Sequence, residues 1–256
     1  MSQAVCTTKA LIGALLFLTV GFDSAQAATY TLGTLKEAPP KEVSPAMVKA
    51  VSKEGVRILR RGKRPVVDIW FRDSAPRPKP EEAKKSKNGV TLTTHLDEGA
   101  FLGILRFHRK HYDFRDKGLP AGVYAMRYAI QPQDGDHLGA SPTRDFVLLS
   151  PVEKDLKLDP ILTNDLVKLS LEVSKTKHPA SLFLTAESKD REQAESKLPL
   201  IFHDKKHNWH IVDFRIAYED GENSAAKEDG KNDDTGTAAG KKSLRLGLIV
   251  VGKAEE

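Results

Sequence analysis

Apolar residues recur at every second position along several short segments, and this period constrains the fold of the chain most. The clearest segments are residues 65–72, 123–131 and 209–218, where for example Val212 and Phe214 share one face. Successive side chains of a β-strand point to opposite faces of a sheet. Each of these segments therefore predicts a half-buried strand.

Further short apolar runs separated by turn residues follow along most of the chain. They read "VRIL", "VTLTTHL", "FLGILRFHR", "RDFVLLS", "ASLFLTAE", "LPLIFH" and "SLRLGLIVVG". About ten short strands without a regular alternation of strand and helix predict a mainly β chain, folded as an antiparallel β-sandwich of immunoglobulin or jelly-roll type. An up-and-down barrel is the alternative arrangement of the same strands.

Two segments depart from the period of two and predict short helices. Ser44 and Pro45 form a helix-start signal, because serine accepts a hydrogen bond from the first turn and proline suits the first helical position. We expect this helix over residues 45–53. A second helix is indicated by leucines and valine at three- and four-residue steps between Leu162 and Val173.

The first 27 residues have the layout of a secretory signal peptide. One lysine precedes a 13-residue apolar run, and Ala25 and Ala27 follow in the spacing of a cleavage site. The run is shorter than the roughly 20 residues that a membrane-spanning helix needs. We therefore expect an exported chain, periplasmic or secreted, whose mature part has no transmembrane span. Cleavage removes Cys6, the one cysteine, so no disulfide or thiol nucleophile is expected.

Residues 28–256 are predicted to form a single domain with two flexible loops. Residues 73–88 are charged and contain prolines, and residues 219–242 are acidic and poor in apolar side chains. Segments of this composition bury too little apolar surface to offset the entropy lost on ordering.

Positive charge is concentrated in one part of the sequence. Residues 57–87 hold eleven Lys and Arg against four Asp and Glu, in a chain with a net charge of +5. An exported chain seldom meets nucleic acid, so we expect no nucleic-acid partner and favour an anionic lipid or polysaccharide surface. The alternative is a solvated face that aids solubility. Trp70, Trp209 and Tyr112 are candidates for a sugar-binding platform, or else for the core.

The segment "QPQDGDHLG" (residues 131–139) follows a predicted strand and contains two aspartates and a histidine close together. If Asp134 is taken as the first residue of a calcium-binding loop, acidic residues occupy the first, third and twelfth positions. The fifth position is Leu138, which has no side-chain oxygen to bind the ion, and the flanking segments are predicted strands. A hairpin turn at Asp134-Gly135 is the alternative. The candidate ligand-binding residues are Asp134, Asp136, His137, Arg144 and Asp145.

His108 and His111 form an H-x-x-H pair that could contribute to a divalent metal site. Together with Asp134, Asp136 and His137 they are the candidate metal ligands, and no other cofactor is expected. Residues three apart in a straight strand point to opposite faces, so the two histidines converge only across a bulge or turn. Otherwise they are loop residues.

Two segments resemble a group of uncharacterised exported bacterial proteins. They read "DFRDKGLPAGVYAMRYAIQPQDGDHLGASPTRDFVLLSP" and "HPASL", and the resemblance spans roughly residues 65–184. It implies an extracytoplasmic location and brings no reaction, cofactor or catalytic residue.

These observations favour a non-enzymatic binding module for an extracytoplasmic protein or glycan of the envelope, with the 131–145 loop as its contact surface. The alternative is a metal-binding protein or metal-dependent enzyme that uses the Asp and His residues. A purely structural envelope protein is a third reading. No oligomeric state follows from the sequence.

Overall fold

The structure is a computed structural model, and it describes residues 29–76, 96–132, 143–185, 198–218 and 242–253. This part of the chain is mainly β, which confirms the predicted class. Its helices all fall short of the length and hydropathy that crossing a membrane requires. The strands are β1 Tyr30–Leu35, β2 Gly55–Arg60, β3 Arg64–Phe71, β4 Ser74–Ala75, β5 Phe101–Phe107, β6 His111–Tyr112, β7 Gly118–Leu119, β8 Gly122–Ile130, β9 Asp145–Pro151, β10 Ser181–Thr185, β11 Leu200–Asp204, β12 Trp209–Tyr218 and β13 Lys242–Val251. The helices are α1 Pro45–Ala50 and α3 Thr163–Ser174.

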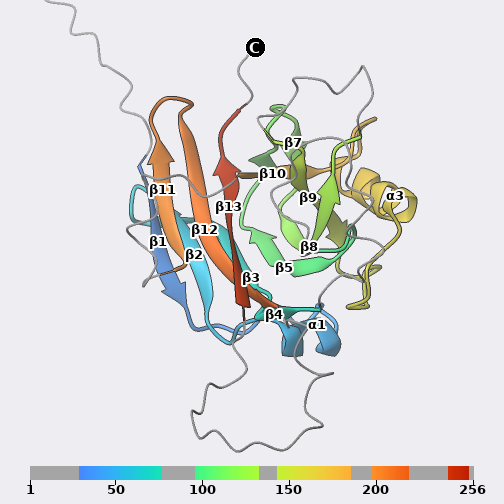
Figure 1. Cartoon of the computed structure of the whole chain (residues 1–256). Coiled ribbons are helices and arrows are strands. Elements are labelled where there is room, and N and C mark those ends of the chain that lie inside the picture. Colours follow the sequence, from blue (N-terminus) through green and yellow to red (C-terminus); the bar gives the residue numbers. More distant parts are fainter. Residues whose placement is uncertain (1–28, 77–95, 133–142, 186–197, 219–241, 254–256) are drawn as a thin grey trace, which may run out of the picture.

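Eleven of these strands form one curled sheet (Figure 1). Its order is β1-β2-β3-β5-β8-β9-β10-β13-β12-β11, with β4 beside β12 and with β6 and β7 as a separate pair. Neighbours are antiparallel except for β4 and β12. The sheet curls so far that its two edge strands, β1 and β11, lie next to each other. The immunoglobulin or jelly-roll arrangement is not confirmed by this strand order.

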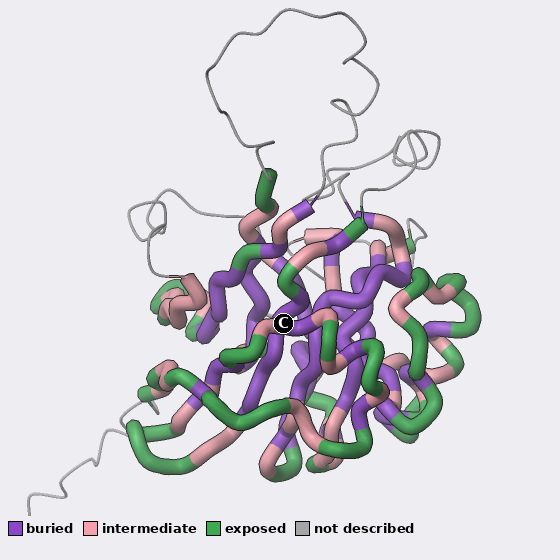
Figure 2. Tube along the Cα trace, turned by 90° about the horizontal axis from the view of Figure 1, so that it is seen from below, coloured by how far each residue is buried: buried purple, intermediate pink, exposed green. Residues whose placement is uncertain are grey.

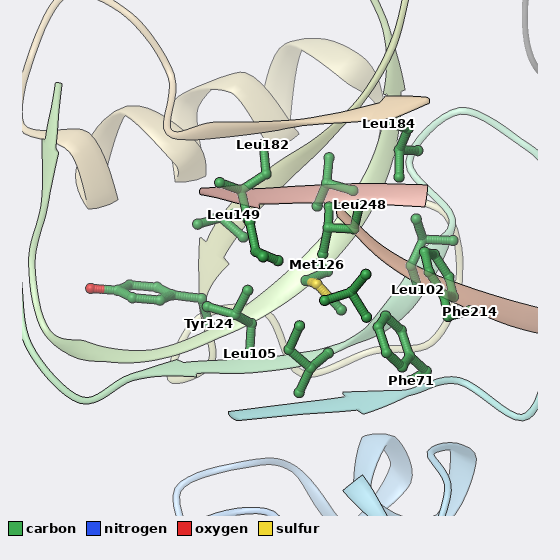
Figure 3. Close-up of a cluster of buried hydrophobic side chains, with 14 of the residues drawn as sticks. Phe71, Leu102, Leu105, Tyr124, Met126, Leu149, Leu182, Leu184, Phe214 and Leu248 are labelled. Atoms are coloured by element: carbon green, nitrogen blue, oxygen red, sulfur yellow. The ribbon is translucent and has the colours of Figure 1, made fainter. Parts of the chain in front are cut away.

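The inner face of the curled sheet encloses the main hydrophobic core. In Figure 3, side chains of β3, β5, β8 and β9 meet those of β10, β12 and β13 in its interior. Phe71 of β3 stacks on Phe214 of β12 with ring centroids 4.1 Å apart. Figure 2 shows the same arrangement along the trace, with buried strands in the centre and exposed turns around them.

Strand β3 is buried more completely than the sequence predicts. Val67, Ile69 and Phe71 face the core as expected. Trp70, on the opposite face, is also fully buried, because α1 and the segment before it cover that side. Its Nε1 donates to the carbonyl of Glu37 at 2.8 Å.

Both predicted helices form close to their expected positions. Ser44 Oγ accepts from the Met47 amide and Pro45 is the first helical residue, but α1 ends at Ala50, earlier than predicted. Helix α3 ends at Ser174 and is capped by Lys175, which adopts a left-handed conformation with φ 54°.

The predicted loops are described only in part. Ser74 and Ala75, inside the expected loop 73–88, pair with the end of β12 as β4 and are therefore not loop residues. The remainder of that loop from residue 77, the segment 219–241 and the predicted signal peptide lie outside the described residues.

Candidate functional site: a basic cavity

A cavity of about 560 Å³ opens at the end of the sheet where β1 begins and β13 ends, the upper end in Figure 1. Four further segments line it. They are the ends of β2 and β3 next to their connecting turn, the residues after β5, strand β6 with its following turn, and the β11–β12 turn. The curl of the sheet brings these segments together, because the β2–β3 and β11–β12 turns belong to opposite sides of the strand order.

The β2–β3 turn is held tightly against the residues at the start of β1. Arg61 and Gly62 have φ values of 54° and 65°, the left-handed conformations that a compact hairpin turn requires. The Arg61 amide donates to the Thr29 carbonyl at 2.7 Å. Tyr30 therefore pairs in register with Arg60, and both line the cavity.

Four cationic side chains in the cavity wall carry uncompensated charge. They are Arg60, Arg64, Arg109 and Lys110, all of them exposed. In the described part of the chain, none of the four forms an ion pair with a carboxylate. A fifth cation, Lys253, is compensated by Asp116 at 2.7 Å. The cavity therefore has a strongly positive potential that attracts anions.

The two histidines of the cavity wall are already hydrogen-bonded. His111 is buried against Phe107, with ring centroids 4.4 Å apart, and its Nε2 donates to the Val250 carbonyl at 2.7 Å. Burial lowers the pKa of His111, so the ring is neutral at pH 7. His207 contacts Asp204 through Nδ1 at 2.6 Å. One nitrogen of each ring is therefore held by an acceptor of the protein.

One of the three aromatic residues considered for a sugar platform is available. Tyr112 lines the cavity and is 49% exposed, with the Lys110 ammonium 5.3 Å from its ring centroid. Trp70 and Trp209 are buried, so the platform of three rings is not formed. Trp209 lies behind the rim, where its Nε1 donates to the Lys253 carbonyl at 2.9 Å.

Of the predicted ligand-binding residues, the two that the structure describes, Arg144 and Asp145, do not belong to this cavity. Asp134, Asp136 and His137 lie outside the described residues. Arg144 donates to the Gln131 carbonyl at 2.9 Å, and buried Asp145 accepts from the Tyr128 hydroxyl. Both lie at the end of β8 away from the cavity, because β8 pairs with Phe107 at its start and with Asp145 at its end.

His108 and His111 are not brought together as metal ligands. Nε2 of His108 lies 2.9 Å from Asp68 on the outer face of the sheet, whereas Nε2 of His111 is bound to Val250. Across the residues that the structure describes, no three His, Cys, Asp or Glu side chains are placed to hold a metal ion.

Asp68 forms the centre of a second polar cluster, on the outer face of β3. It is fully buried and accepts from Arg57 Nε at 2.8 Å and Arg106 Nε at 3.0 Å, in addition to its contact with His108. Burial alone would raise the pKa of Asp68, but these hydrogen bonds and the nearby positive charge lower it below its ordinary value. The cluster is satisfied internally and ties β2, β3 and β5 together.

Comparison with protein-family models, with curated proteins and with solved structures finds no match to this chain.

The cavity was missed from the sequence because its wall comes from distant segments. The signal that could have found it is a pair of basic residues next to the tips of predicted hairpins, as in "RRGKR" and "DKKHN". What the sequence does not show is that the two tips share one end of a curled sheet.

Proposed function

We propose that this protein is an exported binding module that captures an anionic glycan of the cell envelope in the basic cavity. The observation that carries the proposal is the group of four uncompensated cations around a cavity that also exposes Tyr112. Arginine forms paired hydrogen bonds with carboxylate and phosphate groups, and a tyrosine ring packs against a sugar ring. Export through a signal peptide over residues 1–27 forms part of the proposal.

Binding fits the cavity better than catalysis because its acid–base groups are engaged. Asp116 is paired with Lys253, His207 with Asp204, and neutral His111 with a backbone carbonyl. The exposed groups left for a ligand are cationic side chains and the ring of Tyr112.

The proposal includes a sandwich-like view of the scaffold. The half of the sheet with β2, β3 and β5 would act as one layer and the half with β12 and β13 as the other. The stacking of Phe71 on Phe214 across the core supports this view. Such a scaffold would hold the turns at its end rigidly, which reduces the entropy lost when a ligand binds.

The test is a titration of the purified protein with trigalacturonate, a carboxylated sugar, and with maltotriose, a neutral one. Trp209 fluorescence or calorimetry reports binding, since this ring contacts the cavity rim. We expect binding of trigalacturonate only. The double variant Arg64→Gln/Arg109→Gln should bind at least about tenfold more weakly, because each charged hydrogen bond contributes about 1.5–3 kcal/mol.

The matched control is Lys49→Gln/Lys53→Gln, which removes the same charge beside α1 at the opposite end of the sheet. It should bind like the unchanged protein. Equal binding of both sugars, or equal weakening in both double variants, would show that the cavity is not the site.

A further inference from the structure

We propose that the ligand is a linear polyanion that crosses the cavity and contacts positive charge on both sides of it, so that a single sugar acid fills only part of the site. This inference rests on the proposed function and specifies its ligand class. It follows from the distribution of cations beyond the cavity wall.

Positive charge continues outward from the cavity along two turns. Next to the wall residues, the β2–β3 turn carries Arg61 and Lys63, and the β11–β12 turn carries Lys205 and Lys206. All four side chains are exposed, and none of them forms an ion pair with any described carboxylate. A ligand confined to the cavity would not contact these four side chains.

The acidic groups at this end do not neutralise the two turns. Asp204 is occupied by His207 Nδ1 and by the Lys206 amide at 2.9 Å. These contacts lower the pKa of Asp204 against the opposing effect of its burial, so it remains a carboxylate. Asp116 is paired with Lys253. The two turns therefore keep a net positive charge next to the cavity.

The curl of the sheet brings the two charged turns close to each other, because Tyr30 of the cavity wall pairs with Arg60 and contacts His210 of β12. The β2–β3 turn lies one strand in from edge strand β1, and the β11–β12 turn includes the end of edge strand β11. The two edges lie next to each other beside Tyr30. A chain with repeated carboxylates or phosphates can contact one turn, the cavity and then the other turn.

The test compares galacturonic acid, trigalacturonate and polygalacturonate, with dextran as a neutral polymer. We expect affinity to rise with chain length. Binding of the polymer should weaken steeply between about 50 and 200 mM salt, because each neutralised anion releases a counterion. Binding of the monomer should depend on salt only weakly.

Two variants separate the outer cations from the cavity. Arg61→Gln/Lys63→Gln and Lys205→Gln/Lys206→Gln should each weaken polymer binding about tenfold and reduce its salt dependence, while leaving the monomer unaffected. Lys49→Gln/Lys53→Gln is again the control, and circular dichroism confirms that each variant is folded.

The outcomes distinguish this inference from the proposed function. If the polymer binds no more tightly than the trimer, or if the outer variants leave its affinity unchanged, the polyanion inference is wrong while the anionic-glycan site stands. If Arg64→Gln/Arg109→Gln also leaves binding unchanged, both are wrong. Binding to phosphatidylglycerol vesicles without binding to polygalacturonate would likewise contradict both.

Discussion

At the scale of single residues, the rim of the cavity is supported by a group of stacked rings. His203 of β11 stacks on His210 of β12 at 4.3 Å between ring centroids, and Tyr30 of β1 meets His210 edge-on at 4.6 Å. His210 is buried, and its Nδ1 has no hydrogen-bond partner in the described structure. These rings connect the two edge strands just below the cavity opening.

His210 should make stability depend on pH. Burial, reinforced by His203, lowers the pKa of His210 to about 4 from its ordinary value of 6.5. Below pH 6.5 the unfolded chain binds a proton that the folded chain does not, so stability falls as the pH decreases towards 4. The effect reaches about 2 kcal/mol at pH 5, since one pKa unit corresponds to about 1.4 kcal/mol.

The variant His210→Phe keeps the stacked ring and removes the titrating group. Urea unfolding at pH 7 and pH 5 should therefore show a smaller loss of stability in this variant than in the unchanged protein. His178→Gln, at an exposed position, serves as the control and should behave like the unchanged protein. If His210→Phe and the unchanged protein lose stability equally between pH 7 and pH 5, His210 does not cause the pH dependence.

The candidate site residues show what sequence can predict at this scale. The basic run 57–87 and Tyr112 were visible in the sequence, and the structure places Arg60 and Arg64 of that run and Tyr112 in the cavity wall, whereas Arg57 contacts Asp68. The separation of His108 from His111 was not predictable, because it depends on which face of the sheet each ring takes after β5 ends. Likewise, no local sequence pattern indicates that Asp116 forms an ion pair with Lys253.

At the scale of elements, β5 contains an irregularity that allows the sheet to curl. The register between β5 and β8 shifts between Phe101 and Gly103. Gly103 has φ 151°, and an added Cβ would lie 2.4 Å from the Trp70 carbonyl oxygen. Bulges of this kind increase local twist, and glycine is required where backbones approach so closely.

The substitution Gly103→Ala should therefore destabilise the protein by about 3 kcal/mol or more, because β3 and β5 must separate to admit the methyl group. Gly33→Ala in β1 is the matched control, since its Cβ would find the nearest atoms at 3.9 Å. We expect the control to change stability by less than about 1 kcal/mol. Urea unfolding measures both, and comparable losses would contradict the role given to Gly103.

Element prediction succeeded where a local signal exists. The Ser44-Pro45 helix start and the long alternating strands β8 and β12 carry such signals, and all are present. Strands β4, β6 and β7 were missed because two residues cannot display a period, and the six-residue strand β1 was missed as well. The outer face of β3 was misjudged because its burial depends on α1, which packs there from a separate part of the chain.

At the scale of the whole molecule, the core is continuous enough to predict cooperative unfolding. The main cluster includes residues from β2 to β13, and smaller clusters around Trp70 and Trp209 lie on the outer face. Since no strand of the large sheet packs independently of the rest, the two outer clusters should lose their structure together.

The chain's two tryptophans provide the measurement. Trp70→Phe leaves Trp209 as the reporter near the cavity, and Trp209→Phe leaves Trp70 as the reporter beneath α1. In each variant, the fluorescence midpoint in urea should coincide with the midpoint from far-ultraviolet circular dichroism. Separate midpoints within one variant would show that the two ends unfold independently.

The global strand order was the part that sequence could not supply. The first strands follow each other as neighbours, which hairpin signals predict, but β10 pairs with β13 and not with β11. Local patterns contain no information on this choice. The choice depends on which apolar strand faces complete the core together, which is a property of the whole folded molecule.

The position of β13 has a consequence for how the molecule is made. Strand β13 follows β10, β11 and β12 along the chain, yet it lies between β10 and β12 in the sheet. Until β13 has been synthesised, one edge of β10 and the facing edge of β12 have no partner strand in this sheet. Closure of this part of the sheet therefore has to wait for β13, and the β11–β12 hairpin joins the rest of the sheet through that strand.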